Sequence, residues 1–187
     1  MAHTRSDQPF LDRARNGDQN AFRELVERHK LSVARTVSGM LGNDPDVDDV
    51  VQEVFIRFYQ TLDRFRGDAT CKTYLTRIAI NRSLDILRRR KRRSIMFLSR
   101  DHASSYPEPQ VEDTQFDRFD RIQLIQSAIS RLKPHHRAVI VLRLIDGYST
   151  SEAAKILNIA EGTVLSRLSR ATAHLRDIIS PVLEQEM

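Results

Sequence analysis

Apolar residues recur at intervals of three and four along most of the chain, which is the spacing of one face of an α-helix. The clearest stretch runs from Gln19 to Leu41 and is followed by Gly42 and Asn43, residue types that commonly end helices. Its apolar face consists of Phe22, Leu25, Val26, Val33, Val37 and Leu41. Because glycines are few and the spacing is not strictly two, the pattern predicts an all-α fold.

Two further helices are predicted in the first half of the chain. One has Pro45 in its first turn and several acidic residues just after it, which suit the positive end of a helix dipole. Its apolar stripe consists of Val47, Val51, Val54, Phe58, Leu62 and Phe65. The other helix starts near Thr73, after a break at Gly67, and continues into the basic run at residues 88–93.

Periodicity is lost in residues 95–115, where serines, prolines and acidic residues collect as they do in solvated linkers. It then resumes, and Pro134 restarts a helix within the second half of the chain. We therefore predict two small helical domains, residues 1–94 and 116–187, joined by a flexible linker over residues 95–115.

The strongest local signature lies near the end of the chain. Ser149 and Glu152 have the spacing of a capping box, which satisfies two backbone amides where a helix begins, so a helix is predicted over residues 150–157. Asn158 suits a left-handed turn, and another helix should run from about residue 161 to residue 179. Two helices joined by so short a turn are typical of a helix-turn-helix.

Composition and charge narrow the possible functions. The net charge of +5 and a pI near 9.7 favour a polyanionic partner. Cys71 is the single cysteine, so an intramolecular disulfide is impossible, and a cysteine-based zinc site would need ligands that the sequence does not supply. No cofactor, metal or catalytic motif is predicted. The sequence has no signal-peptide pattern and no run approaching the ~20 apolar residues of a membrane span, which predicts a cytoplasmic protein without membrane insertion.

Two of the predicted helices present polar faces that suit nucleic acid. On the third helix, one stripe consists of Arg77, Asn81, Leu84 and Arg88. On the last helix, the outward residues are Leu165, Ser166, Arg167, Ser169 and Arg170. Arginine can bind guanine edges and serine can bind base edges or phosphates, although a solvated amphipathic helix is the alternative for each face. The basic run at residues 88–93 has too many like charges to be internally paired, so we expect it to be solvated or to contact phosphates.

The outward face of the predicted second helix differs from both. Asp49, Glu53 and Gln60 lie there together with the apolar Ile56. An acidic, partly apolar face on a basic protein repels DNA and suits a protein partner. A singly exposed isoleucine on a solvated helix is the alternative.

Taken in order, these segments resemble the extracytoplasmic-function (ECF) sigma factors of the sigma-70 family over nearly the whole chain. Residues 48–55 (Asp-Asp-Val-Val-Gln-Glu-Val-Phe) and Phe65-Arg66-Gly67 are similar to region 2.2 of that family. Residues 74–81 (Tyr-Leu-Thr-Arg-Ile-Ala-Ile-Asn), followed by Leu84-Asp85 and the arginines, are similar to regions 2.3 and 2.4. Residues 162–164, 166–167 and 170–171 are similar to region 4.2.

The resemblance implies a sigma factor that binds core RNA polymerase and directs initiation at specific promoters. The residues implied to bind the clamp helices of the largest polymerase subunit are Asp49, Gln52, Glu53 and Ile56. Those implied to melt and read the minus-ten element are Lys72, Thr73, Arg77, Asn81 and Arg88. Those implied to read the minus-thirty-five element in duplex DNA are Thr163, Ser166, Arg167, Ser169 and Arg170.

The resemblance also implies control by an anti-sigma factor that covers the polymerase-binding surfaces. Two other classes of function are compatible with parts of the pattern. A free-standing helix-turn-helix regulator would leave the acidic helix and the basic run as ordinary surface. A metal-dependent nuclease would need Asp48 and Asp49 as ligands, but these carboxylates lack the spacing of a calcium loop.

Overall fold

The computed structural model describes residues 7–65, 67, 69–98 and 118–184, and every regular element in this part of the chain is helical. The first half contains α1 (Gln8–Arg15), α2 (Gln19–Leu41), α3 (Val47–Thr61), the short 3-10 helix η1 (Leu62–Arg64) and α4 (Cys71–Leu98). The second half contains α5 (Arg118–Arg131), α6 (Pro134–Ile140), the π-helical turn η2 (Val141–Ile145), α7 (Thr150–Leu157) and α8 (Glu161–Glu184). The all-α prediction is confirmed.

Helix α2 has the predicted bounds because its ends are chemically marked. The Asp18 carboxylate accepts hydrogen bonds from the backbone amides of Asn20 and Ala21 at 2.9 and 3.1 Å, which caps the first turn. At the other end Gly42 has a φ of 77°, a left-handed conformation that costs glycine little. Helix α1, which precedes α2 and packs against it, was not predicted.

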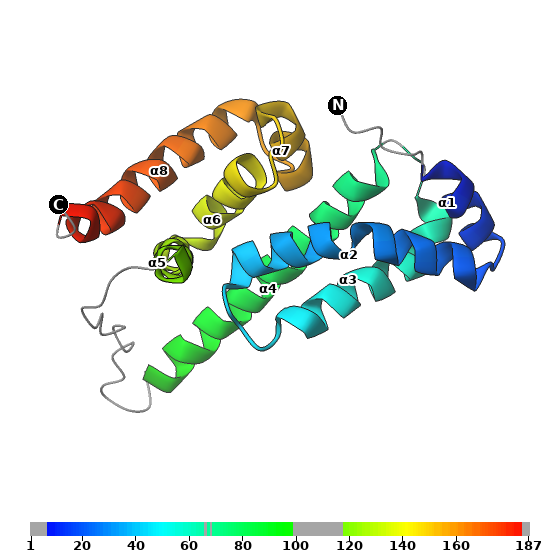
Figure 1. Cartoon of the computed structure of the whole chain (residues 1–187), viewed down its shortest axis with the longest axis horizontal. Helices are drawn as coiled ribbons and strands as arrows, with labels where there is room; N and C mark the ends of the chain where they lie inside the picture. The colour runs from blue at the N-terminus through cyan, green and yellow to red at the C-terminus, as the bar shows by residue number, and fades with distance from the viewer. Residues whose placement is uncertain (1–6, 66, 68, 99–117, 185–187) are drawn as a thin grey trace.

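Helices α2, α3 and α4 form the core of the first half and run side by side (Figure 1). Phe58 is fully buried at their centre, in ring contact with Phe22, Phe65 and Tyr74. Burial of one such aromatic side chain contributes about 1.5–3 kcal/mol. The predicted stripe of α3 needs correction: Val50 and Phe55 are buried, whereas Val47 and Val51 are only half-buried. Pro45 lies before the helix and not in its first turn.

The helix-turn-helix of the second half is formed by α7 and α8. The Ser149 hydroxyl accepts from the Glu152 amide at 3.2 Å, and the Glu152 carboxylate accepts from the Ser149 amide at 2.8 Å. Asn158 then takes the left-handed conformation with a φ of 52°. The predicted capping box and turn are therefore confirmed, while α8 continues beyond the predicted end at residue 179 and includes Pro181.

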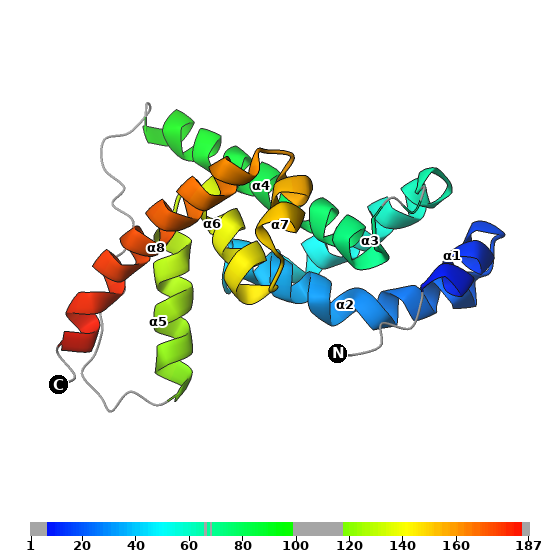
Figure 2. The same ribbon diagram turned by 90° about the horizontal axis from the view of Figure 1, so that it is seen from above.

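The two halves of the chain pack directly on each other. Figures 1 and 2 show α6 and α7 lying against α2 and α4, and one buried apolar cluster contains residues from both halves. Gly39 permits a close approach, because a Cβ atom there would lie 3.0 Å from a methyl carbon of Val141. Sequence reasoning predicted the two units and did not predict this contact.

Polar contacts accompany this packing. The Thr36 hydroxyl donates to the Asp146 carboxylate at 2.8 Å, and the hydroxyls of Thr76 and Tyr148 share a buried hydrogen bond of 2.9 Å. Arg137, which is 6% exposed, donates to the Met40 carbonyl oxygen at 2.6 Å and also to two carbonyls of its own half. Buried polar groups on both sides are thus satisfied by the other half of the chain.

Candidate nucleic-acid interface

The outward face of α3 carries the residues predicted to bind a protein partner. Asp49, Gln52 and Ile56 are exposed, and Ile56 retains 55% of its accessible surface. Glu53 is different, because it is half-buried and accepts hydrogen bonds from Arg82 of α4 and from Arg57. Burial alone would raise the pKa of Glu53, but the hydrogen bond and charge of Arg82 outweigh it and lower that pKa. Glu53 therefore joins α3 to α4 in addition to facing outward.

A groove separates the outward faces of α3 and α4. It has a volume of about 520 Å³, and its lining includes Glu53 and Ile56 from α3 and Asn81 and Arg82 from α4. Asn81, predicted to contact DNA, is exposed beside residues predicted to contact polymerase. The structure thus brings parts of two predicted surfaces together at one groove.

The start of α4 carries the other predicted minus-ten residues. The Thr70 hydroxyl accepts from the backbone amide of Thr73 at 3.2 Å, as a capping residue does at a helix start. Thr73 and Arg77 line a second pocket, also about 520 Å³, whose opposite wall includes Glu152, Lys155 and Asn158 of the helix-turn-helix. The Arg77 Nε atom is buried and has no hydrogen-bond partner within the described residues.

Tyr148, from the second half of the chain, lies against the first turn of α4. The Lys72 ammonium group is 5.3 Å from the centre of the Tyr148 ring, within the range of a cation–π contact. Cys71, the neighbour of Lys72, is 3% exposed and faces the core and not the pocket. Burial, together with the nearby Asp7 carboxylate, raises the pKa of the Cys71 thiol to about 12.

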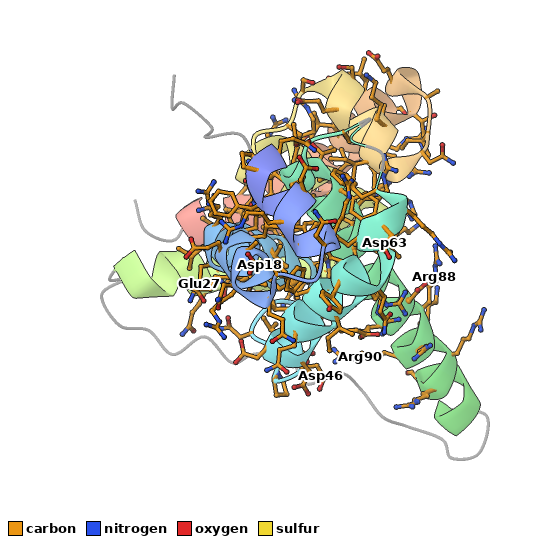
Figure 3. All side chains as sticks on the ribbon, turned by 90° about the vertical axis from the view of Figure 1, so that its right-hand side faces the viewer. Asp18, Glu27, Asp46, Asp63, Arg88 and Arg90 are labelled. Carbon is orange, nitrogen blue, oxygen red and sulfur yellow. The ribbon has the colours of Figure 1, made fainter. Side chains whose placement is uncertain are left out.

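The basic run on α4 is partly paired, which corrects the prediction that it would find no internal partners. Arg88 donates to Asp85 at 3.2 Å, while Arg90 binds Asp44 and Asp46 in the turn between α2 and α3. Figure 3 shows Arg88 and Arg90 on the same helix, with Asp46 beside Arg90. The side chains that stay exposed in this run are Arg88, Arg89, Lys91, Arg92 and Arg93.

Arg90 has a structural role, because it is paired with Asp44 and Asp46. Its hydrogen bond lowers the pKa of the Asp44 carboxyl, against the opposing effect of burial. Through Arg90, Asp44 and Asp46 anchor α4 to the α2–α3 turn.

Helix α8 presents the predicted minus-thirty-five residues on its outer side. Ser166, Ser169 and Arg170 are exposed, whereas Thr163 and Arg167 are half-buried. The Ser166 hydroxyl donates to the Thr163 carbonyl oxygen at 3.1 Å, a local bond that DNA could exchange for its own. Ser166, Ser169 and Arg170 therefore remain accessible to a partner while the two halves of the chain are packed together.

Two histidines on α6 adjoin this face. Burial is the main cause that lowers the pKa of His135 and of His136, and Arg167 adds to the effect on both. The lowered pKa values favour the neutral imidazoles near pH 7, so the positive charge of this face comes mainly from its arginines and lysine.

A helix-turn-helix joined to a helical unit with a partly basic polar face defines a class of helical DNA-binding proteins. Residues 25–93 match Sigma-70 region 2, and residues 122–175 match Sigma-70, region 4. The ECF RNA polymerase sigma-E factor of Escherichia coli K12 is 33% identical over 192 residues, covering 99% of this chain and 100% of that protein. The RNA polymerase sigma factor NccH of Alcaligenes xylosoxydans xylosoxydans is 33% identical, over 92% and 94% of the two chains.

The chain therefore belongs to the sigma-70 family and to its ECF sigma factors, which confirms the resemblance found in the sequence. Members of this family are transcription initiation factors and are not known enzymes.

Solved structures give the same fold. CnrH in complex with the cytosolic domain of CnrY has a TM-score of 0.67 at 30% identity, covering 97% of this chain and 99% of that one. The sigma factor RpoE of Bartonella quintana, in complex with the anti-sigma factor NepR, has a TM-score of 0.66 at 22% identity, covering 85% and 96%, and supports the fold alone. Among the described helices, none is long and apolar enough to cross a membrane.

Proposed function

We propose that this sigma factor divides its work among three surfaces. The α3 face, with Asp49, Gln52, Glu53 and Ile56, binds the clamp helices of the largest polymerase subunit. The start and outer stripe of α4 read and melt the minus-ten element, and the outer face of α8 reads the minus-thirty-five element. The observation that carries the proposal is that exposed acidic and apolar side chains lie on α3, whereas exposed basic and hydroxyl side chains lie on α4 and α8.

At the minus-ten element, Lys72, Thr73, Arg77 and Asn81 capture an unpaired base. Extruding a base from a duplex costs a few kcal/mol, so the protein must supply stacking and hydrogen bonds in return. The unpartnered Nε of Arg77 beside a pocket of about 520 Å³ supports this role. Arg88 and the exposed basic residues that follow it contact phosphates of the same strand.

At the minus-thirty-five element, α8 enters the major groove of duplex DNA. Ser166, Ser169 and Arg170 contact base edges from the exposed side of the helix. Thr163 and Arg167, being half-buried, contact the phosphate backbone at the margins of that surface.

The chain acts in the cytoplasm, together with RNA polymerase and DNA, and an anti-sigma factor controls it. The complexes of CnrH with CnrY and of RpoE with NepR support the second part of this proposal. The exposed side chains of Ile56 on α3 and Ile125 on α5 offer apolar contacts to such a partner from both halves of the chain.

Run-off transcription is the decisive experiment. Purified core polymerase with this protein, supplied with a genomic library of promoters, should start transcription at discrete positions. Active core that gives no specific start would overturn the proposal. Specific, high-affinity binding to duplex DNA without polymerase, combined with no stimulation of initiation, would instead identify a free-standing helix-turn-helix regulator.

A further inference from the structure

Three side chains that are distant in sequence meet beneath the start of α4. Asp7 lies just before α1, His29 is on α2, and Cys71 is the first residue of α4. One potential ligand atom from each lies within 4.8 Å of the other two, and the described residues contain no other such group of three. His29 and Cys71 are buried and Asp7 is nearly so. The single cysteine argued against a cysteine-based zinc site in the sequence, but the structure places that cysteine with an imidazole and a carboxylate.

The three groups match the ligand chemistry of zinc. Thiolate, imidazole and carboxylate all bind Zn²⁺, whereas Ca²⁺ and Mg²⁺ prefer oxygen alone. In a tetrahedral site with bond lengths of about 2.0–2.3 Å, the ligand atoms lie roughly 3.3–3.8 Å apart. The Nε2 atom of His29 and Oδ2 of Asp7 are hydrogen-bonded at 3.0 Å and would move slightly apart on binding an ion, while the separations of up to 4.8 Å within the group would shorten.

Arg28 orients the carboxylate from outside the cluster. Its Nη1 atom is 3.6 Å from Oδ1 of Asp7, and its guanidinium group stacks over the Phe10 ring at 4.0 Å from the centroid. With Oδ1 held in this way, Oδ2 remains directed toward His29. Outer partners that fix a ligand in this manner are typical of zinc sites.

A nucleophilic cysteine is the other chemistry that these residue types could provide. Cys71 does not suit it, because the side chain is only 3% exposed and burial raises the pKa of the thiol to about 12. An activated nucleophile needs access and a lowered pKa. A bound metal ion, by contrast, deprotonates a coordinating thiol outright.

We propose that Asp7, His29 and Cys71 bind one divalent transition ion of zinc type. The ion would have three protein ligands and a fourth position for water or another ligand. It would join the segment before α1 to α2 and to the start of α4. Lys72 and Thr73, which are predicted to contact the minus-ten element, follow Cys71 directly in the first turn of α4, so a bound ion would also hold this turn in place. This consequence rests on the proposed function, whereas the ion site does not.

Cobalt(II) titration of the full chain, kept reduced, tests the site directly. Tetrahedral Co²⁺ has visible d–d bands, and a thiolate ligand adds a charge-transfer band in the near ultraviolet. Because Cys71 is the single cysteine, that band can come from no other residue. We expect one equivalent of Co²⁺ to produce both features and one equivalent of Zn²⁺ to remove them.

Variants separate the proposed ligands from other imidazoles. Cys71→Ser should abolish the charge-transfer band, while His29→Gln and Asp7→Asn should weaken Co²⁺ binding by at least about tenfold. His174→Gln changes an exposed histidine on α8 and should leave the titration unaltered. Zn²⁺ should also raise the Tm of the wild-type chain and not that of Cys71→Ser, because binding to the folded state stabilises it.

Absence of the thiolate band with the wild-type chain in excess Co²⁺ would overturn the proposal. Cobalt bands that persist unchanged in Cys71→Ser would overturn it as well, since the ion would then lie elsewhere. The wild-type titration keeps the test valid even if a variant fails to fold. Neither polymerase nor DNA is needed, so failure here is distinguishable from failure of the proposed function.

Discussion

The two predicted DNA-reading surfaces differ in how far the rest of the chain covers them. On α8, Ser166, Ser169 and Arg170 are exposed. On α4, Thr73 and Arg77 are half-buried and line a pocket whose other wall belongs to the helix-turn-helix unit. The packed arrangement therefore leaves the surface predicted to bind duplex DNA open and partly covers the surface predicted to bind unpaired DNA.

This difference suggests an order of events. Duplex recognition through α8 requires no change in the packing of the two halves. We expect an unpaired base to reach Arg77 more easily when α7 and Tyr148 move away from the start of α4, because α7 lines part of the pocket beside Arg77. The contacts between the halves therefore set the free energy of exposing the minus-ten surface, and each of the following changes tests part of this comparison.

The largest effect is expected from Arg137, which bridges the halves. Arg137→Met keeps an apolar stem but leaves the Met40 carbonyl and two others without their donor. We expect the free energy of unfolding to fall by about 2–4 kcal/mol, since the lost bonds are to a charged, buried donor. Urea denaturation monitored by circular dichroism measures this free energy. Arg131→Met, at an exposed position on α5, is the control and should change stability little.

A second pair of variants separates the two reading surfaces. Arg77→Ala should reduce promoter opening by about 10- to 100-fold and leave closed-complex binding near normal, because the proposed contact of Arg77 is with unpaired DNA. Arg170→Ala should weaken closed-complex binding by about the same factor through lost duplex contacts. Permanganate footprinting reports opening, and band-shift assays with holoenzyme report binding. Equal loss of closed-complex binding in both variants would contradict the division.

Gly39 tests whether close packing holds the halves together. In Gly39→Ala, the new Cβ atom would lie 3.0 Å from Val141, so the helical gain of about 1 kcal/mol expected for alanine over glycine should be cancelled. Gly162→Ala makes the same change in α8, where nothing lies within 4 Å. Only Gly39→Ala should increase the radius of gyration in small-angle scattering. An unchanged radius would show that the interface adapts to the methyl group.

The smallest effect concerns the charge of Asp146. Burial raises the pKa of Asp146, while its bond to Thr36 and the charges of Lys72 and Arg35 oppose that rise. A raised folded-state pKa means that stability is greatest with the carboxyl protonated and is lost as pH rises through that pKa. Asp146→Asn should therefore be slightly more stable than wild type at pH 7, with the difference vanishing in acid.

Thermal melts across pH measure the Asp146 effect. Asp63→Asn, an exposed carboxylate in the 3-10 helix η1, is the control and should lack this crossover (Figure 3). A difference between Asp146→Asn and wild type that does not change with pH would rule out the carboxylate charge as its cause.

Local chemistry explains what could be predicted from the sequence. The ends of α2 and α7 are marked by side chains within a few residues, such as Asp18, Gly42 and Ser149. The stripe on α3 was predicted with errors because α2 and α4 both pack on that helix and bury a wider arc than one stripe. Phe55 is buried for this reason.

Contacts between distant residues leave no periodic signal. Thr36 and Asp146 are 110 residues apart, and Arg90 lies 46 residues from Asp44. The predicted site residues could be assigned to surfaces by helical spacing and family resemblance. The partial burial of Arg77 and the pairing of Glu53 with Arg82 depend on how whole helices pack, and only the structure reveals them.

Three contacts between the two halves of the chain come from residues 141–148, which include the π-helical turn. Val141 packs on Gly39, Asp146 binds Thr36 and Tyr148 binds Thr76, while the turn itself is closed by the Asp146 amide donating to the Val141 carbonyl at 2.8 Å. Because these contacts come from so short a stretch, we expect them to break together. Single-molecule distance records should accordingly show abrupt jumps between two separations, with dwell times that a partner could lengthen or shorten.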